Sequence, residues 1–365
     1  MSRRRTPRAL GEAAAIVGLV FACATALGGL GGAAIASVYP VADVQGGGGP
    51  SDVIWLNEAL AADQRAIAGY VASGPLLSGD AQKADGWFLG QELRHAGVLR
   101  SLIAGLGGTP HDPDPSYPFG HPRTTGQVIA LLRSLERGQI AATAAAIGGL
   151  HEGWMRARLA AMLADDAQHL AVLGIFAGQP RSGGAFPVSF PARVNPRDDA
   201  RFSDLLRAET LVAAVIGWAE QSGRLGTQAD ELAAFMGGHE DAQLNVLARM
   251  LRGAARRGSS SGTSGGLTLG EVLRASSVPI SQSELQHGRG WVHLLAAVEW
   301  QLEGLLYYVT IPRLTARDAL LATSIMASAA EHAALLAELP GPGSTPTAVP
   351  AALVRGKRLR DQPPW

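Results

Sequence analysis

Residues 90–99 read GQELRHAGVL and place a glutamate and a histidine, Glu92 and His95, three positions apart. Residues at this spacing share one face of an α-helix, and steps of three and four continue the same face to the apolar residues Phe88 and Leu99. A carboxylate and an imidazole are costly to bury unless they are hydrogen-bonded or their charge is compensated. The stretch therefore predicts a helix whose core-facing side carries polar, chemically active groups.

Three neighbouring stretches show the same pattern, an apolar stripe interrupted by a carboxylate near its middle. The helices that these four stripes predict lie at about 52–73, 81–106, 124–148 and 153–177. The further carboxylates are Asp63, Glu136 and Asp166, and Asp166 is followed three residues later by a second histidine, His169. If the four faces meet, four carboxylates and two imidazoles share one core.

Four more helical patterns follow and repeat the first four. They are predicted at about 199–222, 227–253, 285–309 and 315–339. His169 matches His332 at an offset of 163 residues, whereas Glu92 matches Glu240 at an offset of 148. The difference corresponds to an insertion between the second and third helices of the second set. The sequence therefore predicts an internal duplication.

The lengths of the connections predict how each set folds. In both sets the first and third connections are short, and short connections join antiparallel neighbours. The second connection is long in both sets, as a bundle with one crossover requires. No stretch alternates with a period of two, so no sheet is expected. The predicted fold class is all-α, with two tandem four-helix bundles at 52–178 and 199–340.

The buried charges of the first set require compensation. Removing a carboxylate from water costs several kcal/mol, and a whole domain is stable by only about 5–15 kcal/mol. Protonation or hydrogen bonds from the histidines would relieve part of the repulsion. A pair of metal ions bridged by carboxylates is a simpler solution. Oxygen ligands with one imidazole for each ion suit iron or manganese better than zinc.

The first set resembles the ferritin-like di-iron carboxylate superfamily, and in particular its exported bacterial members. The residues that carry the resemblance are Asp63, Tyr70, Glu92-x-x-His95, Glu136 and Asp166-x-x-His169. The resemblance implies single carboxylate ligands at Asp63 and Glu136 and paired ligands on the other two helices. Aspartate stands at 63 and 166 where the family has glutamate, which is one methylene longer. Tyr70 is expected to line the site or to pack in the core.

The function that this resemblance implies is a di-iron centre, with manganese as an alternative, that reacts with oxygen or peroxide. It would act as an oxidase or ferroxidase, or it would consume peroxide. The alternative is a metal-free structural or stress-related helical protein of the cell envelope. Lysine plus arginine equal aspartate plus glutamate at 31 each, so nucleic acid is not an expected partner. A single cysteine, Cys23, excludes an intrachain disulfide framework.

The second set is expected to be degenerate. Gln243 stands where the first set has His95, and Ala329 stands where it has Asp166. The polar residues that remain on the stripes are Glu209, Glu240, Glu299 and His332. They leave two interpretations open, a site for one ion and, as the favoured one, a packing partner whose site has decayed. His239 is expected to be exposed.

The start of the chain predicts export. Residues 1–36 combine arginines at the start with 24 uncharged residues from Ala13 to Ala36, as in a signal peptide with a small-residue cleavage site. The run is also long enough to span a bilayer, so a membrane anchor is the alternative. The start partly matches a twin-arginine signal. Residues 37–51 and 179–198 are expected to be linkers, and the proline-rich residues 341–365 a disordered tail.

Overall fold

The computed structural model describes residues 49–179, 183–190, 192–255, 268–269 and 280–339. Over these ranges the chain forms helices and no strand, so the all-α prediction is confirmed. The predicted export signal, most of the linker at 37–51 and the predicted tail at 341–365 lie outside the described residues.

The helices begin and end close to the predicted positions. The first four are α2 (Pro50–Ser73), α3 (Gly79–Gly105), α4 (Thr125–Gly149) and α5 (Gly153–Phe176). The next four are α6 (Asp199–Gln221), α7 (Thr227–Ala255), α9 (Gly288–Leu305) and α10 (Ala316–Ala337). Local chemistry explains several of these ends. Pro50 occupies the first turn of α2, where a missing N–H costs nothing, and Thr124 caps α4 by accepting a hydrogen bond from the Gln127 backbone N–H at 3.2 Å.

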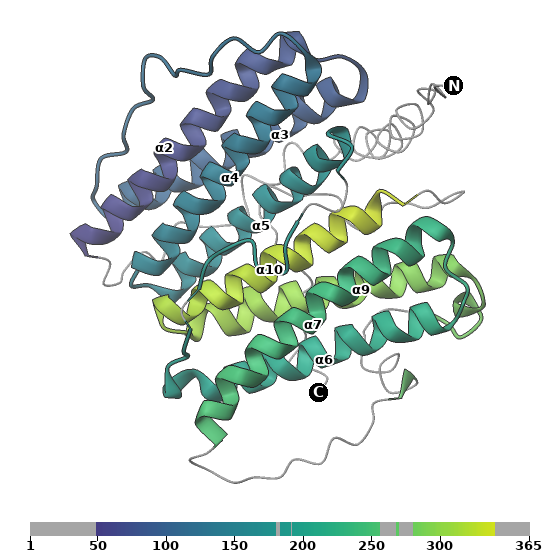
Figure 1. Cartoon of the computed structure of the whole chain (residues 1–365). Coiled ribbons are helices and arrows are strands. Elements are labelled where there is room, and N and C mark those ends of the chain that lie inside the picture. The colour runs from purple at the N-terminus through teal and green to yellow at the C-terminus, as the bar shows by residue number, and fades with distance from the viewer. Residues whose placement is uncertain (1–48, 180–182, 191, 256–267, 270–279, 340–365) are drawn as a thin grey trace, which may run out of the picture.

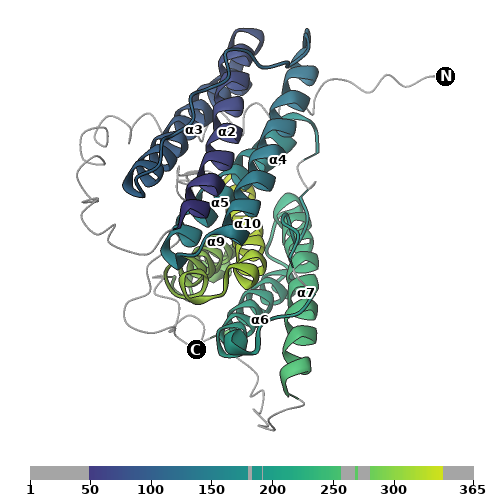
Figure 2. The ribbon, with the colours of Figure 1, turned by 90° about the vertical axis from the view of Figure 1, so that its left-hand side faces the viewer.

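The helices pack in two groups with matching contacts. In the first group α2 lies against α3 and α4, and α4 lies against α5. In the second group α6 lies against α7 and α9, and α9 lies against α10. Figure 1 shows α2–α5 in the upper part of the molecule and α6, α7 and α9 in the lower part, with α10 next to α5. Figure 2 shows the same two groups from the side.

Two glycines show that α2 and α4 run in opposite directions. Gly69, near the end of α2, lies directly against Leu135 in the first half of α4. Gly149, at the end of α4, lies against Trp55 near the start of α2. The side chains of the larger residues occupy the space that a Cβ atom would fill, so each glycine allows the two helices to approach closely.

The long connection between α3 and α4 runs along α2. At its start, the Asn57 side chain donates to the Thr109 carbonyl at 3.2 Å and accepts from the His111 N–H at 2.8 Å. Gln64, two turns further along α2, donates to the His111 carbonyl at 2.8 Å. Phe119 then packs near Gly69, close to the end of α2. The connection therefore returns the chain to the end at which α4 must begin.

The two groups meet mainly through α5 and α10. Both helices are long and apolar enough to cross a membrane, but 83% and 94% of the apolar stretches are buried inside the protein. Such burial is what the central helices of a folded core show. Gln168 of α5 donates to the Ala330 carbonyl of α10 at 3.3 Å, and buried Arg156 donates to the Leu314 carbonyl at 2.6 Å. The interface therefore combines apolar packing with a few buried hydrogen bonds.

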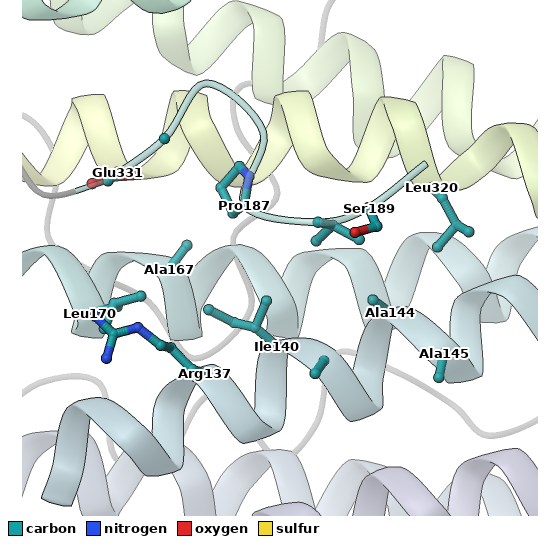
Figure 3. Close-up of a pocket in the computed structure, with 14 residues that line it drawn as sticks. Arg137, Ile140, Ala144, Ala145, Ala167, Leu170, Pro187, Ser189, Leu320 and Glu331 are labelled. Atoms are coloured by element: carbon teal, nitrogen blue, oxygen red, sulfur yellow. The ribbon is translucent and has the colours of Figure 1, made fainter. Parts of the chain in front are cut away.

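A cavity of about 550 Å³ lies beside this interface. Figure 3 shows it between α10, which contributes Glu331 and Leu320, and the two helices that carry Ile140 and Ala167, with Pro187 and its neighbours crossing over it. Its walls are mostly apolar, and the Glu331 side chain is 6% exposed. Burial raises the pKa of Glu331 from its ordinary 4.5 to about 8.

The start of α5 gives a prediction about stability. A Cβ atom on Gly153 would lie 1.8 Å from the backbone oxygen of Pro312, and backbone cannot move aside as a flexible side chain can. We expect Gly153→Ala to lower the free energy of unfolding by about 1–3 kcal/mol, as overpacking does. The control is Gly138→Ala on the exposed side of α4, where a Cβ atom meets nothing within 4 Å. That change should raise stability by about 0.5–1 kcal/mol, because alanine favours helix. Denaturant titration of both variants distinguishes these outcomes, and equal stabilities would contradict the close contact.

The carboxyl group of Glu331, which lines the cavity, gives a prediction about how stability depends on pH. Because the pKa of Glu331 is raised to about 8 in the folded chain, its contribution to stability is complete below pH 4.5 and is lost as the pH rises towards 8. Glu331→Gln removes this loss, so the variant should be more stable than the parent at pH 9, by a few kcal/mol. The difference should shrink towards pH 4.5. The exposed change Glu58→Gln is the control for the loss of a glutamate outside the cavity in the same urea titrations. A constant offset at all pH values would show that Glu331 ionises normally.

Candidate metal centre

The six predicted ligands meet in the interior of the first group of helices. Each of these side chains is at most 1% exposed. They come from α2 (Asp63), α3 (Glu92, His95), α4 (Glu136) and α5 (Asp166, His169). The apolar stripes predicted this convergence because each places its carboxylate one or two turns from large buried residues such as Leu60 and Phe88.

The six side chains form two groups that share one carboxylate. In the first, ligand atoms of Asp63, Glu92 and His95 lie within 4.8 Å of one another. The second contains Glu92, Glu136, Asp166 and His169, again with ligand atoms within 4.8 Å of one another. Glu92 therefore stands between two neighbouring sets of donor atoms, as a bridging carboxylate would.

Both histidines present the same nitrogen to the carboxylates. His95 Nδ1 lies 3.5 Å from Glu92 Oε2 and 3.5 Å from Asp166 Oδ1. His169 Nδ1 lies 3.3 Å from Glu92 Oε1 and 3.3 Å from Glu136 Oε1. The ring of His169 is held by Phe88, which stacks on it with ring centroids 4.1 Å apart. The two Nδ1 atoms are thus the nitrogens that face the shared interior.

A further carboxylate, Asp165, contacts the opposite nitrogen of both rings, although the stripe pattern does not predict it. Its Oδ2 atom lies 3.3 Å from His95 Nε2 and 3.5 Å from His169 Nε2. Gln91 adds a contact of 2.7 Å to His169 Nε2 and donates to Asp165 Oδ1 at 3.3 Å. Asp165 lies beside the stripe, but α5 is buried on most of its surface. The adjacent pair Asp165-Asp166, in a helix of mostly apolar residues, is the sequence feature that could have indicated a second buried aspartate.

Two more polar side chains, Gln139 and Tyr70, complete the interior. Gln139 donates to Asp63 Oδ1 at 3.3 Å and also to Glu92 Oε2. The Tyr70 hydroxyl donates to Glu136 Oε1, so this tyrosine lines the site in addition to packing on Phe88. Gln139 lies three residues after Glu136 on the same face, a position that the ligand pattern alone does not single out.

Burial and mutual repulsion shift the pKa values of the carboxyl groups. Burial, assisted by the charge of Glu92, raises the pKa of Asp63 to about 8. Burial also raises the pKa of Glu136 to about 7 and holds that of Asp166 well above its usual range. Burial acts in the same direction on Glu92, but hydrogen bonds from His169 and His95 outweigh it and lower its pKa to about 2. The site is thus a cluster of carboxyl groups that cannot all ionise without a counter-charge.

Several buried oxygens of this cluster have no hydrogen-bond donor. Among the described residues, none donates to Asp63 Oδ2 or to Glu136 Oε2. Unsatisfied buried oxygens are unusual in folded proteins and require an explanation, of which an ion is one. The four carboxylates and two Nδ1 atoms form a mixed oxygen and nitrogen donor set, and two divalent ions would neutralise the four carboxylates. The residues present therefore fit a pair of first-row metal ions.

The second group of helices contains a smaller cluster. Ligand atoms of Glu240, Glu299 and His332 lie within 4.8 Å of one another. His332 Nδ1 lies 2.9 Å from Glu299 Oε1 and 3.8 Å from Glu240 Oε1. Glu209 is fully buried beside Glu240, and burial raises its pKa to about 7. The polar residues that the second set retains therefore also converge.

His239 was predicted to be exposed, and this prediction was wrong. The residue is buried, and its Nδ1 atom lies 2.9 Å from His332 Nε2. Residues 183–190 explain the error, because this part of the predicted linker covers the face of α7 on which His239 lies. Gln243, one turn further, donates to the Ala185 carbonyl at 3.0 Å instead of replacing a ligand. Contact between a helix and a distant segment of the chain is a tertiary feature, and helical periodicity in the sequence cannot predict it.

Comparisons with known proteins identify no relative of this chain. No protein-family model, no curated protein and no solved structure matches the chain. The chemistry of the site is therefore inferred from the arrangement of its own residues.

Proposed function

We propose that the chain is an exported ferritin-like protein whose first four helices form a bundle that holds two iron ions, with manganese as the alternative. The observation that carries this proposal is the sharing of Glu92 between two sets of buried donor atoms. The antiparallel packing of α2 with α4 and the long connection along α2 also support a bundle with one crossover. The second four helices would form the degenerate copy.

Each residue has a definite task in this proposal. Asp63 and His95 would hold one ion, and Glu136 and His169 the other. Glu92 and Asp166 would contact both, because His95 Nδ1 faces both of these carboxylates. Asp165 would orient the two imidazoles from the side of their Nε2 atoms. It would accept from His95 Nε2–H directly, and Gln91, which donates to Asp165, would accept from His169 Nε2–H. In the metal-bound protein the two Nδ1 atoms would then act as ligands in place of their hydrogen bonds to Glu92.

A bound pair of iron ions would supply electrons for the reduction of oxygen or peroxide. The chain contributes a dry interior, in which Phe88 and Tyr70 exclude water from one end of the carboxylate cluster. The Tyr70 hydroxyl holds a proton next to Glu136 Oε1, within the cluster. Such a proton donor beside the metal ligands is suited to an oxidase, a ferroxidase or a peroxide-consuming activity.

The proposal of export depends on residues 1–36, whose basic start and uncharged run are typical of a signal peptide or an anchor.

The rival function is a metal-free helical protein of the envelope. It is favoured by the hydrogen bonds that Gln139 and Tyr70 already make to the carboxylates. Metal analysis separates the two.

Metal content tests the proposed centre directly. Full-length chain made in iron-supplemented medium should contain two more iron ions than the Glu92→Gln variant, because Glu92 belongs to both sets of donor atoms. Glu136→Gln should lower the content by one ion, since Glu136 belongs to one set. Elemental analysis and protein concentration give both numbers. Circular dichroism checks that the isosteric variants are folded. A folded parent with the same iron content as Glu92→Gln would support the metal-free rival.

The orientation of the histidines gives a separate prediction. Asp165→Asn should weaken metal binding by about 10–100-fold without removing a ligand, as changes to the partners of metal-bound histidines do. Asp85→Asn is the matched control. Asp85 is another buried aspartate, 4% exposed, on α3 but outside both sets of donor atoms. Competition with a chelator measures both affinities. Equal affinities would show that Asp165 does not position the imidazoles.

A further inference from the structure

The cluster in the second group of helices is built differently from the first. Three helices supply its closest donor atoms, Glu240 from α7, Glu299 from α9 and His332 from α10. All three side chains are at most 1% exposed. Within the described part of the chain no second imidazole joins these donor atoms, and Gln243 is turned towards Ala185. The donor set is therefore sufficient for one ion and not for two.

The orientation of His332 is fixed by a chain of hydrogen bonds. Its Nδ1 atom faces the carboxylates, and its Nε2 atom lies 2.9 Å from Nδ1 of His239. His239 in turn is hydrogen-bonded to the backbone of Gly183. The Ser328 hydroxyl lies 3.4 Å from His239 Nδ1 and 3.5 Å from His332 Nε2. In the tautomer in which Gly183 accepts from His239 and His239 Nδ1 accepts from His332 Nε2–H, the Nδ1 atom of His332 has a lone pair that faces Glu299 and Glu240. Metal-bound histidines are held by such outer partners.

Buried, unsatisfied oxygens provide an independent indication. No N–H group and no hydroxyl group of the described residues donates to either oxygen of Glu209, or to Glu240 Oε2 and Glu299 Oε2. Glu209 is 0% exposed and its carboxyl group lies against that of Glu240. Two carboxyl groups in contact must share either a proton or a cation. Glu240 and Glu299 have ligand atoms within 4.8 Å of His332, and Glu209 lies against Glu240, so the unsatisfied oxygens belong to one buried cluster.

We infer that the second group of helices holds one divalent transition-metal ion, bound by Glu240, Glu299 and His332 Nδ1, with Glu209 as a fourth ligand and His239 as the outer partner of His332. Three carboxylates and one imidazole suit iron, manganese or cobalt. One shared proton between Glu209 and Glu240 would leave two negative charges for the ion to neutralise. The site is independent of the proposed di-metal centre, because it shares no residue with it.

The experiment uses Co²⁺ as the probe, since its affinity exceeds those of Mn²⁺ and Fe²⁺ and its visible spectrum reports coordination. The full chain carries Glu92→Gln and Glu136→Gln, so that the first centre is disabled. This background should bind one Co²⁺ and develop a ligand-field spectrum. Adding Glu299→Gln or His332→Gln should weaken binding at least 100-fold. Adding His239→Phe should weaken it by about 10–100-fold and leave the stoichiometry at one.

Glu338→Gln is the matched control, because Glu338 is a buried glutamate near the end of α10 outside the cluster. It should leave the Co²⁺ affinity unchanged. Circular dichroism verifies that each variant is folded, and the isosteric Glu240→Gln replaces any variant that is not. A folded background that binds no Co²⁺ overturns the inference, as does binding that survives Glu299→Gln. Neither result bears on the first centre, which the difference in iron content between the parent and Glu92→Gln reports.

Discussion

Burial of carboxyl groups without enough positive partners is the constraint that governs this molecule. In the first group of helices, five buried carboxylates surround two imidazoles, and every one of these side chains is almost completely shielded from water. Desolvation of that kind opposes folding by several kcal/mol for each charge unless protons, hydrogen bonds or ions compensate it. Large apolar residues on the same helix faces supply the opposing stabilisation. The apolar packing that stabilises the fold therefore also offsets the cost of burying the charged groups of the site.

Much of this arrangement follows from the spacing of residues. Steps of three and four from Glu92 to His95 and Leu99 were sufficient to predict the face of α3, and the same rule gave Asp63, Glu136 and Asp166 on their helices. Connection lengths predicted which helices are neighbours. These features are local, because a helix face and a loop length depend on residues close together in the chain. For that reason residue spacing was enough to predict that these six side chains share one interior.

The features that were missed depend on contacts between distant segments. Asp165 lies beside the apolar stripe of α5, and it is interior because His95 and Gln91 of α3 lie against it. His239 is covered by residues 183–190, a segment whose composition predicts only a linker. Gln139 and Gln91 are neutral amides, and their importance comes from the carboxylate or imidazole opposite them. None of these partners can be identified from periodicity.

The contact between α5 and α10 couples the stability of the two groups of helices, α2–α5 and α6–α10. Each helix is buried on almost all sides, so removing or unfolding one half would expose apolar surface of the other. Opening one half exposes the central helix of the other, and the whole chain should therefore unfold in a single cooperative transition. Any ligand that binds one half only in its folded form would then protect both halves from proteolysis. Through the shared interior, stabilisation of one half extends to the whole described core.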